Sequence, residues 1–256
     1  MTGPAPGEEP LTGGNVTAGV VRVGDTVRRP PGPQTPAVHA VLEHLHEVGF
    51  RHAPRSLGLD DLGRHVVEYV PGVLAHPPRP GVGRLDPAVV GRLVRDLHDA
   101  LDGWRPPVDA VWVCPIPTDG DDLVVHNDIA PWNIVIADDR LVIIDWDGCS
   151  PGTRTWDLAY VAHAVVPLEP ATPWRDAALR LRALADGYGL DDEARRRLAA
   201  TLAPRCWSMH TLLEHGHEHG VHPWSRLWDA GHGTVWRRDA EWAAMRADQL
   251  EATLRT

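Results

Sequence analysis

The segment at residues 126–133, which reads His-Asn-Asp-Ile-Ala-Pro-Trp-Asn, constrains the fold of this chain more than any other feature. It lies between the short apolar runs 123–125 and 134–136, and a third run at 141–144 leads directly into Asp-Trp-Asp at 145–147. Short apolar runs bounded by polar residues are typical of β-strands. The pattern therefore predicts a polar loop between short strands, with side chains that can project into a cleft.

Asp128, Asn133 and Asp145 are the residue types that metal-dependent phosphoryl transfer requires. Asp128 would orient an acceptor hydroxyl and take its proton, Asn133 would bind a metal ion through its side-chain oxygen, and Asp145 would bind Mg²⁺ on nucleotide phosphates. We expect His126 to support the loop by hydrogen bonds. For Asp147 two roles stay open, assistance in metal binding or capping of a surface turn. Each residue alone is ordinary for a turn, but together and between strands they indicate a catalytic centre.

The composition excludes several classes of protein. The net charge of −10 is unsuited to a nucleic-acid partner, which would require a basic face. No apolar stretch approaches the roughly 20 residues of a membrane span, and the first ten residues lack both a basic and an apolar region. Cys114, Cys149 and Cys206 are widely spaced, which favours reduced thiols over disulfides or a zinc site. We expect a cytoplasmic protein without membrane or nucleic-acid partners.

The first 74 residues favour a small, β-rich lobe. Residues 1–10 have the Pro, Gly and Glu content of a disordered tail. Local signals then predict a glycine-rich turn at 12–15, a hairpin of 16–23 and 26–29 around Gly24 and Asp25, a helix at 37–48 and a strand at 64–70. A lobe of residues 11–74 follows from these elements.

The rest of the chain is mainly helical in pattern. A proline-rich stretch at 75–83 marks the lobe boundary, and Asp86 is a plausible N-cap for the helix that follows it. Apolar residues recur at helical spacing in 85–101, 174–188, 191–201, 204–215 and 234–254. The sequence thus predicts an α+β chain with a second, larger lobe of residues 75–256.

These motifs resemble those of the aminoglycoside phosphotransferase family, the broader phosphotransferase group that shares the protein-kinase-like fold. The resemblance runs from residue 11 to about residue 200 and rests on the segments 11–15, 68–72, 126–133, 144–147, 152–159 and 185–190. It implies a bilobal fold and ATP- or GTP-dependent phosphorylation, with Mg²⁺, of a hydroxyl on a small molecule. It also implies that the backbone of Glu68, Tyr69 and Val70 is the hinge that holds the nucleotide base, and that Asp157 braces the metal-binding loop.

The chain departs from the family in having no lysine, although the family carries one on the third strand to contact the nucleotide phosphates. Arg28 or Arg29 must take this role if any residue does, and we favour Arg28. Arginine keeps the charge and can bind phosphate through two donors, but its planar fork is not equivalent to an ammonium group. The partner of this cation on the following helix is open among Glu43, Glu47 and His39.

Several alternatives stay open. The acceptor could be an aminoglycoside, choline, homoserine, methylthioribose or a macrolide, because fold and motif do not choose among them. The missing lysine leaves a nucleotide-binding pseudokinase with a regulatory role as the competing hypothesis. The four histidines within residues 215–222 could form a zinc hydrolase site, although a surface loop fits their spacing better. Trp207, His210 and Glu214, one helical turn apart, could face the acceptor.

Overall fold

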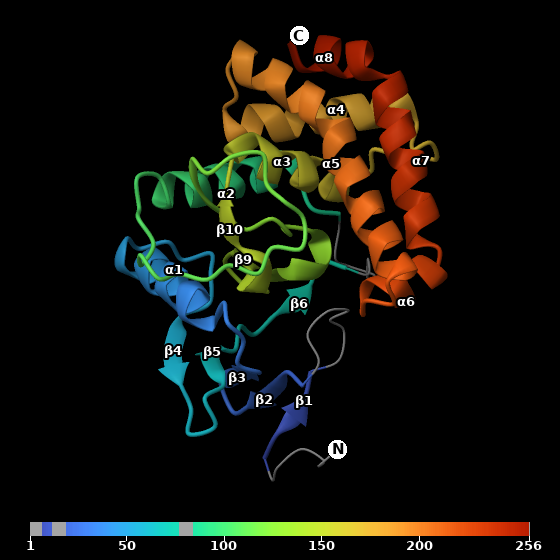
Figure 1. Cartoon of the computed structure of the whole chain (residues 1–256). Coiled ribbons are helices and arrows are strands. Elements are labelled where there is room, and N and C mark those ends of the chain that lie inside the picture. Colours follow the sequence, from blue (N-terminus) through green and yellow to red (C-terminus); the bar gives the residue numbers. More distant parts are fainter. Residues whose placement is uncertain (1–6, 12–18, 77–83, 256) are drawn as a thin grey trace.

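A computed structural model describes residues 7–11, 19–76 and 84–255 (Figure 1). The turn predicted at 12–15 and most of the proline-rich stretch at 75–83 lie outside the described residues. The β-rich part with helix α1 occupies one end of the molecule, and the helices from α2 onward form the other (Figure 1). The predicted bilobal α+β architecture is confirmed.

The small lobe is a five-stranded antiparallel sheet on which α1 (Thr35–Glu47) packs. In spatial order the strands are β1 (Glu9–Pro10), β2 (Val21–Val23), β3 (Thr26–Arg29), β5 (His65–Glu68) and β4 (Ser56–Leu59). The predicted hairpin is confirmed for 21–23 and 26–29, since Val21 pairs with Arg28 and Val23 with Thr26, while residues 16–18 lie outside the described ranges. Gly24 has a φ of 57°, so glycine suits the two-residue turn.

The sheet begins earlier than the sequence indicated. Glu9–Pro10 pairs with Arg22 and Val21 as strand β1, and Glu8 forms an ion pair of 2.8 Å with Arg64. The assignment of these residues to a disordered tail is therefore wrong. The composition of residues 1–10 contains no strand signal, and the ion-pair partner Arg64 lies far along the chain, so the pairing was missed.

The lobes meet at a second, smaller set of strands. Strand β6 (Val73–Leu74) pairs with β8 (Ile134–Ile136), which pairs in turn with β9 (Leu141–Ile143). Strand β7 (Leu123–Val125) pairs with β10 (Ser150–Gly152). Strand β6 thus joins the end of the predicted small lobe to strands of the larger one, and the boundary at 74/75 stays a prediction.

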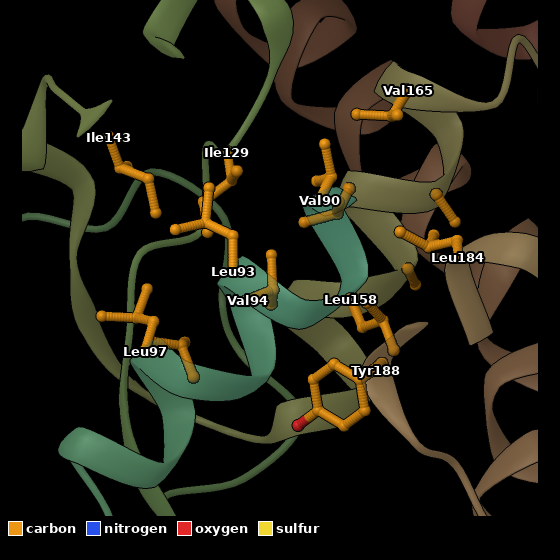
Figure 2. Packing of buried hydrophobic residues seen from close by; sticks show 14 of the residues in the cluster. Val90, Leu93, Val94, Leu97, Ile129, Ile143, Leu158, Val165, Leu184 and Tyr188 are labelled. Carbon is orange, nitrogen blue, oxygen red and sulfur yellow. The ribbon is translucent and has the colours of Figure 1, made fainter. Parts of the chain in front are cut away.

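Helix α2 (Pro87–Ala100) lies at the centre of the large lobe's core. Asp86 caps it as predicted, because its carboxylate accepts from the Ala88 N–H over 2.9 Å. One face carries buried side chains at helical spacing, and full burial of each stabilises the fold by about 1.5–3 kcal/mol. In Figure 2 that face, with Val90, Leu93, Val94 and Leu97, lies among Ile129, Ile143, Leu158, Val165, Leu184 and Tyr188. Since Ile129 follows Asp128 directly, this core supports the predicted catalytic loop.

Two glycines allow α2 and α4 (Trp174–Tyr188) to pack very closely. A Cβ on Gly91 would lie 2.3 Å from the Leu184 carbonyl oxygen, and one on Gly187 would lie 2.2 Å from the Ala88 carbonyl oxygen. Each glycine therefore provides the space in which the other helix's backbone sits.

The remaining helices are α3 (Arg154–Val165), α5 (Asp192–Glu218), α6 (Trp224–Asp229), α7 (His232–Met245) and α8 (Ala247–Arg255). Helix α5 is continuous, so the prediction of two helices followed by a loop from residue 215 is wrong. Pro204 lacks an N–H and leaves the Ala200 carbonyl without its intrahelical donor. Buried side chains on both sides of it, Leu202 and Cys206, keep the helix packed against the core through this defect.

The single helix predicted at 234–254 is also wrong, because this stretch forms two helices, α7 and α8, that meet at Arg246. Within the ranges that the structure describes, none of the helices is both long enough and apolar enough to cross a membrane.

Candidate active site

The loop after β7 has a left-handed residue at its second position. Asn127 has a φ of 67°, a region that asparagine tolerates better than most residues. The N–H groups of Asn127 and His126 both donate to the Asp157 carboxylate, over 2.8 and 3.4 Å. Arg205 donates to the Asn127 carbonyl oxygen over 3.1 Å. The loop is thus held through its main chain, while Asp128 next to it keeps its side chain for other contacts.

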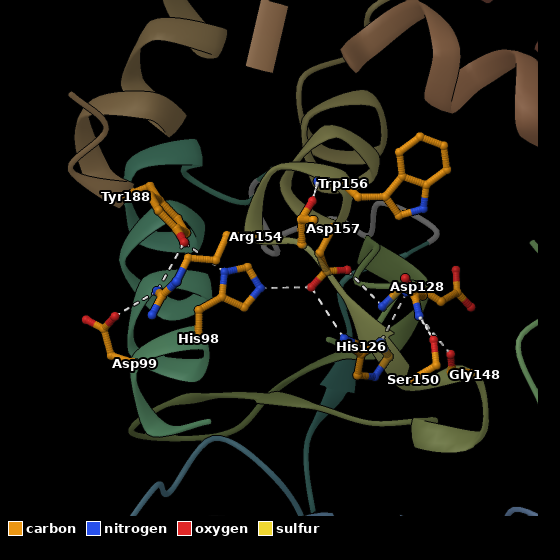
Figure 3. Close-up of polar contacts among 12 residues, drawn as sticks. His98, Asp99, His126, Asp128, Gly148, Ser150, Arg154, Trp156, Asp157 and Tyr188 are labelled. Atoms are coloured by element: carbon orange, nitrogen blue, oxygen red, sulfur yellow. Dashed lines mark hydrogen bonds and ion pairs between the residues drawn. The ribbon is translucent and has the colours of Figure 1, made fainter. Parts of the chain in front are cut away.

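Asp157 lies at the centre of a buried polar network (Figure 3). Besides the loop N–H groups it contacts His98 Nε2 over 3.1 Å, and His98 Nδ1 lies 2.8 Å from the Tyr188 hydroxyl. Burial would raise the pKa of Asp157, but the hydrogen bonds from His98 and from the Asn127 N–H outweigh it and hold that pKa below its ordinary value. A charged carboxylate is therefore available to fix the backbone of the loop.

His126 joins the loop to the segment that precedes Asp145. Its Nδ1 accepts from the Asp128 N–H over 3.2 Å, so Nε2 carries the hydrogen and donates to the Ile144 carbonyl oxygen, also over 3.2 Å. The ring is fully buried and meets Trp146 edge-on at 4.7 Å. Because burial lowers the pKa of His126, the ring is neutral and acts through hydrogen bonds.

Asp128 lies half-buried among groups that orient its carboxylate. Asn133, in the short turn η1 (Pro131–Asn133), donates from its amide nitrogen to Asp128 Oδ2 over 2.8 Å and to the Asp128 carbonyl oxygen over 2.9 Å. The Tyr160 hydroxyl on α3 also hydrogen-bonds the carboxylate. Burial, followed by the charge of Asp145, raises the pKa of Asp128 to about 6, against the lowering effect of Tyr160 and Asn133. The carboxylate is ionised at neutral pH and basic enough to accept a proton.

Arg29 connects the small lobe to the carboxylates of Asp145 and Asp147. Its Nη2 lies 2.6 Å from Asp145 Oδ1 and 2.5 Å from Asp147 Oδ2. Asp145 has φ and ψ of 66°, and Asp147 follows in the 3-10 turn η2 (Trp146–Gly148). Burial would lower the pKa of Arg29, but the charges of Asp145 and Asp147 outweigh it, so the pKa is raised and the guanidinium stays charged.

Arg28, the residue favoured by the sequence, lies elsewhere. Its Nε is 3.6 Å from the carboxylate of Asp60, the residue that follows β4. Successive side chains of a strand point to opposite faces, so only one of the two arginines can face the carboxylates. The structure gives that position to Arg29.

The predicted hinge begins at Glu68, the last residue of β5. The N–H of Glu68 donates to the Arg55 carbonyl oxygen and that of Tyr69 to the Asp25 carbonyl oxygen, both over 2.9 Å, so these two groups bond within the small lobe. The Arg22 guanidinium stacks 3.8 Å above the Tyr69 ring. Val70 continues the chain toward β6.

The sequence did not reveal three further residues at the site. Tyr160 lies one helical turn after Asp157, so their spacing could have placed both on one face of α3. Arg205 and His98 come from α5 and α2, and no local pattern distinguishes them from surface residues. The Arg205 guanidinium is buried 4.5 Å from the centre of the Tyr160 ring and therefore lies beneath the loop.

The three residues considered for the acceptor differ in their exposure. His210 is buried and its Nδ1 contacts the Gly233 carbonyl oxygen over 3.0 Å, which turns it toward α7. Trp207 packs edge-on against His210 at 5.4 Å, while Glu214 is exposed. The ring of His210 is thus used in the packing of α5 on α7, and a contact of these three residues with the acceptor stays a prediction.

The histidines of 215–222 take part in helix packing. His217 stacks on Trp228 at 5.4 Å and lies 3.3 Å from Asp229. His215 packs against His219 at 4.1 Å. Across the described parts of the chain, no three His, Cys, Asp or Glu side chains are grouped so that they could hold a metal ion.

Comparison with known proteins places this site in a family. The profile of the phosphotransferase enzyme family matches residues 108–200, which include the loop at 126–133 as well as Asp145, Asp147 and Asp157. The trifolitoxin immunity protein of Rhizobium leguminosarum bv. trifolii is 30% identical over 259 residues, covering 95% of this chain and 97% of the relative.

Solved structures agree on the fold. A choline/ethanolamine kinase family protein from Mesorhizobium loti superimposes with a TM-score of 0.59 at 20% identity, over 99% of this chain and 93% of that one. Amicoumacin kinase hAmiN gives a TM-score of 0.66 at 12% identity, over 96% and 88%. At these identities the likeness establishes the kinase-like fold alone. With the profile match and the full-length relative, it follows that the chain belongs to the phosphotransferase enzyme family.

Proposed function

We propose that the chain is an ATP-dependent kinase that transfers the terminal phosphoryl group to a hydroxyl of a small molecule. One observation carries the proposal: the Arg29 guanidinium of the small lobe contacts Asp145 and Asp147, and Asp145 lies close enough to Asp128 to raise its pKa. Phosphoryl transfer depends on positioning and charge neutralisation and requires no nucleophilic residue. This set of charges, drawn from both lobes, meets that requirement.

The donor atoms at the site fit Mg²⁺, which prefers oxygen ligands. The Asn133 amide nitrogen is used in two hydrogen bonds to Asp128, so its side-chain oxygen is the atom available for a metal. Asp145 and Asp147 approach each other closely enough for one guanidinium nitrogen to contact both. Bound Mg²⁺ would neutralise the charge of the nucleotide phosphates. We assign Asn133 and Asp145 as its ligands.

The residues of the chain would act as follows. Asp128 would accept the proton of the acceptor hydroxyl as the oxygen bonds to the terminal phosphorus. The bond from that phosphorus to the bridging oxygen breaks, and its electron pair stays on the departing ADP. Arg29 would contact the phosphates, and the backbone of residues 68–70 would hold the base. GTP is the alternative to ATP as the phosphoryl donor. His126 and Asp157 would keep the loop in place.

A second candidate concerns the biological role. Because the 30% sequence identity with the trifolitoxin immunity protein extends over 95% of the chain, we include inactivation of a toxin by phosphorylation among the proposed roles of this kinase. The choline/ethanolamine kinase family protein and the amicoumacin kinase that superimpose on this chain suggest choline, ethanolamine and amicoumacin as acceptors to be tested. The three free cysteines are those of a protein in a reducing compartment, and we propose the cytoplasm.

The first test is nucleotide binding, followed by acceptor screening. Thermal shift with Mg²⁺ and a non-hydrolysable ATP or GTP analogue should show stabilisation of the wild type and of an exposed control, Asp138→Asn, but much less for Asp145→Asn. ADP formation is then measured across choline, ethanolamine, aminoglycosides, amicoumacin, macrolides and trifolitoxin. Binding without turnover under any acceptor would favour the pseudokinase, and absence of binding would refute the kinase assignment.

A further inference from the structure

Helix α1 does not supply the counterion of Arg29. In protein kinases, the strand lysine is held by a glutamate of the corresponding helix. Here Glu43 Oε2 lies 3.2 Å from His39 Nε2, and its side chain is more than half exposed. Glu47, at the end of the helix, is also exposed.

A chain of hydrogen-bonded side chains lies between α1 and Arg29. His39 Nδ1 lies 2.5 Å from the Ser56 hydroxyl, which lies 2.8 Å from His65 Nε2. His65 is the β5 partner of Arg29 in the sheet and is almost completely buried. Its pKa is lowered to about 4, by burial first and then by the charges of His39 and Arg29, so it is neutral at physiological pH. This hydrogen-bonded chain stands where an ion pair from Arg29 to the helix would otherwise lie.

Asp147 is the carboxylate that is placed to hold Arg29. It lies in η2, two residues after Asp145, and both carboxylates share the same guanidinium nitrogen. A Mg²⁺ ion on Asp145 would compete with Arg29 for the charge of that carboxylate, whereas Asp147 would keep its charge for Arg29. An ion pair of this type is strong because it is charge-assisted and only partly exposed.

Arg29 also has a donor to spare. Its Nε is buried and has no hydrogen-bond partner among the described residues. A buried donor without a partner is costly, and a phosphate oxygen would satisfy it. The guanidinium can therefore stay on Asp147 through Nη2 and still donate to a nucleotide.

On the basis of the proposed function, we infer that Asp147 is a positioning residue that anchors Arg29 for phosphate binding, in place of the helix glutamate of protein kinases. Strand β3 is then tied directly to the Asp145 segment of the larger lobe. Nucleotide binding consequently requires no ion pair from α1.

The test is a double-mutant cycle on the affinity for Mg²⁺ and a non-hydrolysable ATP analogue, measured by calorimetry. Arg29→Met and Asp147→Asn should each weaken binding roughly tenfold or more, and the double variant should be no weaker than Arg29→Met alone, because coupled residues are not additive. Asp147→Glu keeps the charge and should recover most of the loss. Glu43→Gln, the matched helix control, should stay within about twofold of wild type.

Two results would overturn the inference. Additive losses in the double variant, together with a raised Mg²⁺ requirement for Asp147→Asn alone, would make Asp147 a metal ligand that is independent of Arg29. A loss in Glu43→Gln equal to that in Asp147→Asn would return the anchor to α1. If the wild type itself does not bind the analogue, the proposed function fails before the cycle is begun, so the two failures are distinguishable.

Discussion

Asp128→Asn should make the protein more stable at neutral pH while removing its activity. The wild-type carboxylate is partly withdrawn from water beside Asp145, and this raises the pKa of Asp128 from its ordinary 3.8 to about 6. A raised carboxyl pKa means that the fold disfavours the charged form. Asparagine keeps an acceptor for Tyr160 and Asn133 but carries no charge, so the unfavourable term disappears.

The magnitude follows from the pKa difference. At 1.36 kcal/mol per pKa unit, a displacement from 3.8 to about 6 corresponds to roughly 3 kcal/mol as an upper limit. Because solvent still reaches the side chain, we expect about 1–3 kcal/mol. The folded state holds the proton more tightly than the unfolded state, so the Asp128 carboxyl adds stability as the pH falls from about 6 toward 4. The advantage of the variant is therefore complete above about pH 7 and absent below about pH 4.

The assay is urea unfolding of the wild type and of Asp128→Asn at several pH values, with exposed Asp138→Asn as the control for a charge removed without burial. The control should change stability by less than about 0.5 kcal/mol at every pH. A variant that is less stable than wild type at about pH 8, or one whose advantage does not shrink as the pH falls, would refute the reasoning that burial dominates the environment of Asp128.

Three further predictions concern groups around the loop and the core. Tyr160→Phe removes a hydrogen bond that lowers the pKa of Asp128, so the acid limb of the kcat/KM profile should move upward from about pH 6 by roughly half to one unit; an unmoved limb would mean that the hydroxyl does not act on the carboxylate. His98→Leu leaves the buried Asp157 charge without a side-chain partner and should cost on the order of 3 kcal/mol of unfolding free energy in urea; a loss below about 1 kcal/mol would contradict the role of this contact. Gly187→Ala places a Cβ against the backbone of α2 and should lower stability by on the order of 2 kcal/mol. At an ordinary helical position, replacing glycine by alanine would instead raise stability by about 0.5–1 kcal/mol. A thermal-denaturation midpoint above that of wild type would show that the two helices can separate freely.

Local signals in the sequence were sufficient for much of the fold. The Asp86 cap, the Gly24 turn and the short apolar runs each act within a few residues, so the helix and strands that they mark could be predicted. The catalytic segment was recognisable for the same reason, because Asp128 and Asn133 are five residues apart on one loop. In this respect local chemistry and tertiary structure agree.

The contacts between distant segments could not be predicted. Whether Arg28 or Arg29 faces the carboxylates depends on which face of β3 looks toward the larger lobe, and only the packed lobes decide that. Arg205 on α5 and His98 on α2 lie many residues away from the loop in sequence. They come close to it only when the helices pack. Continuity of α5 through Pro204 is likewise an effect of packing, which outweighs the local preference for a break.

Acceptor-dependent ADP formation, compared between the wild type and Asp128→Ala, examines the proposed kinase most directly. With Mg²⁺ and a stimulating acceptor, the wild type should form ADP together with the phosphorylated acceptor, and Asp128→Ala should lose this activity by on the order of a hundredfold or more while still binding nucleotide. If Asp128→Ala turned over the acceptor at a rate close to that of wild type, Asp128 would not be the base, and the assignment of the site would be contradicted.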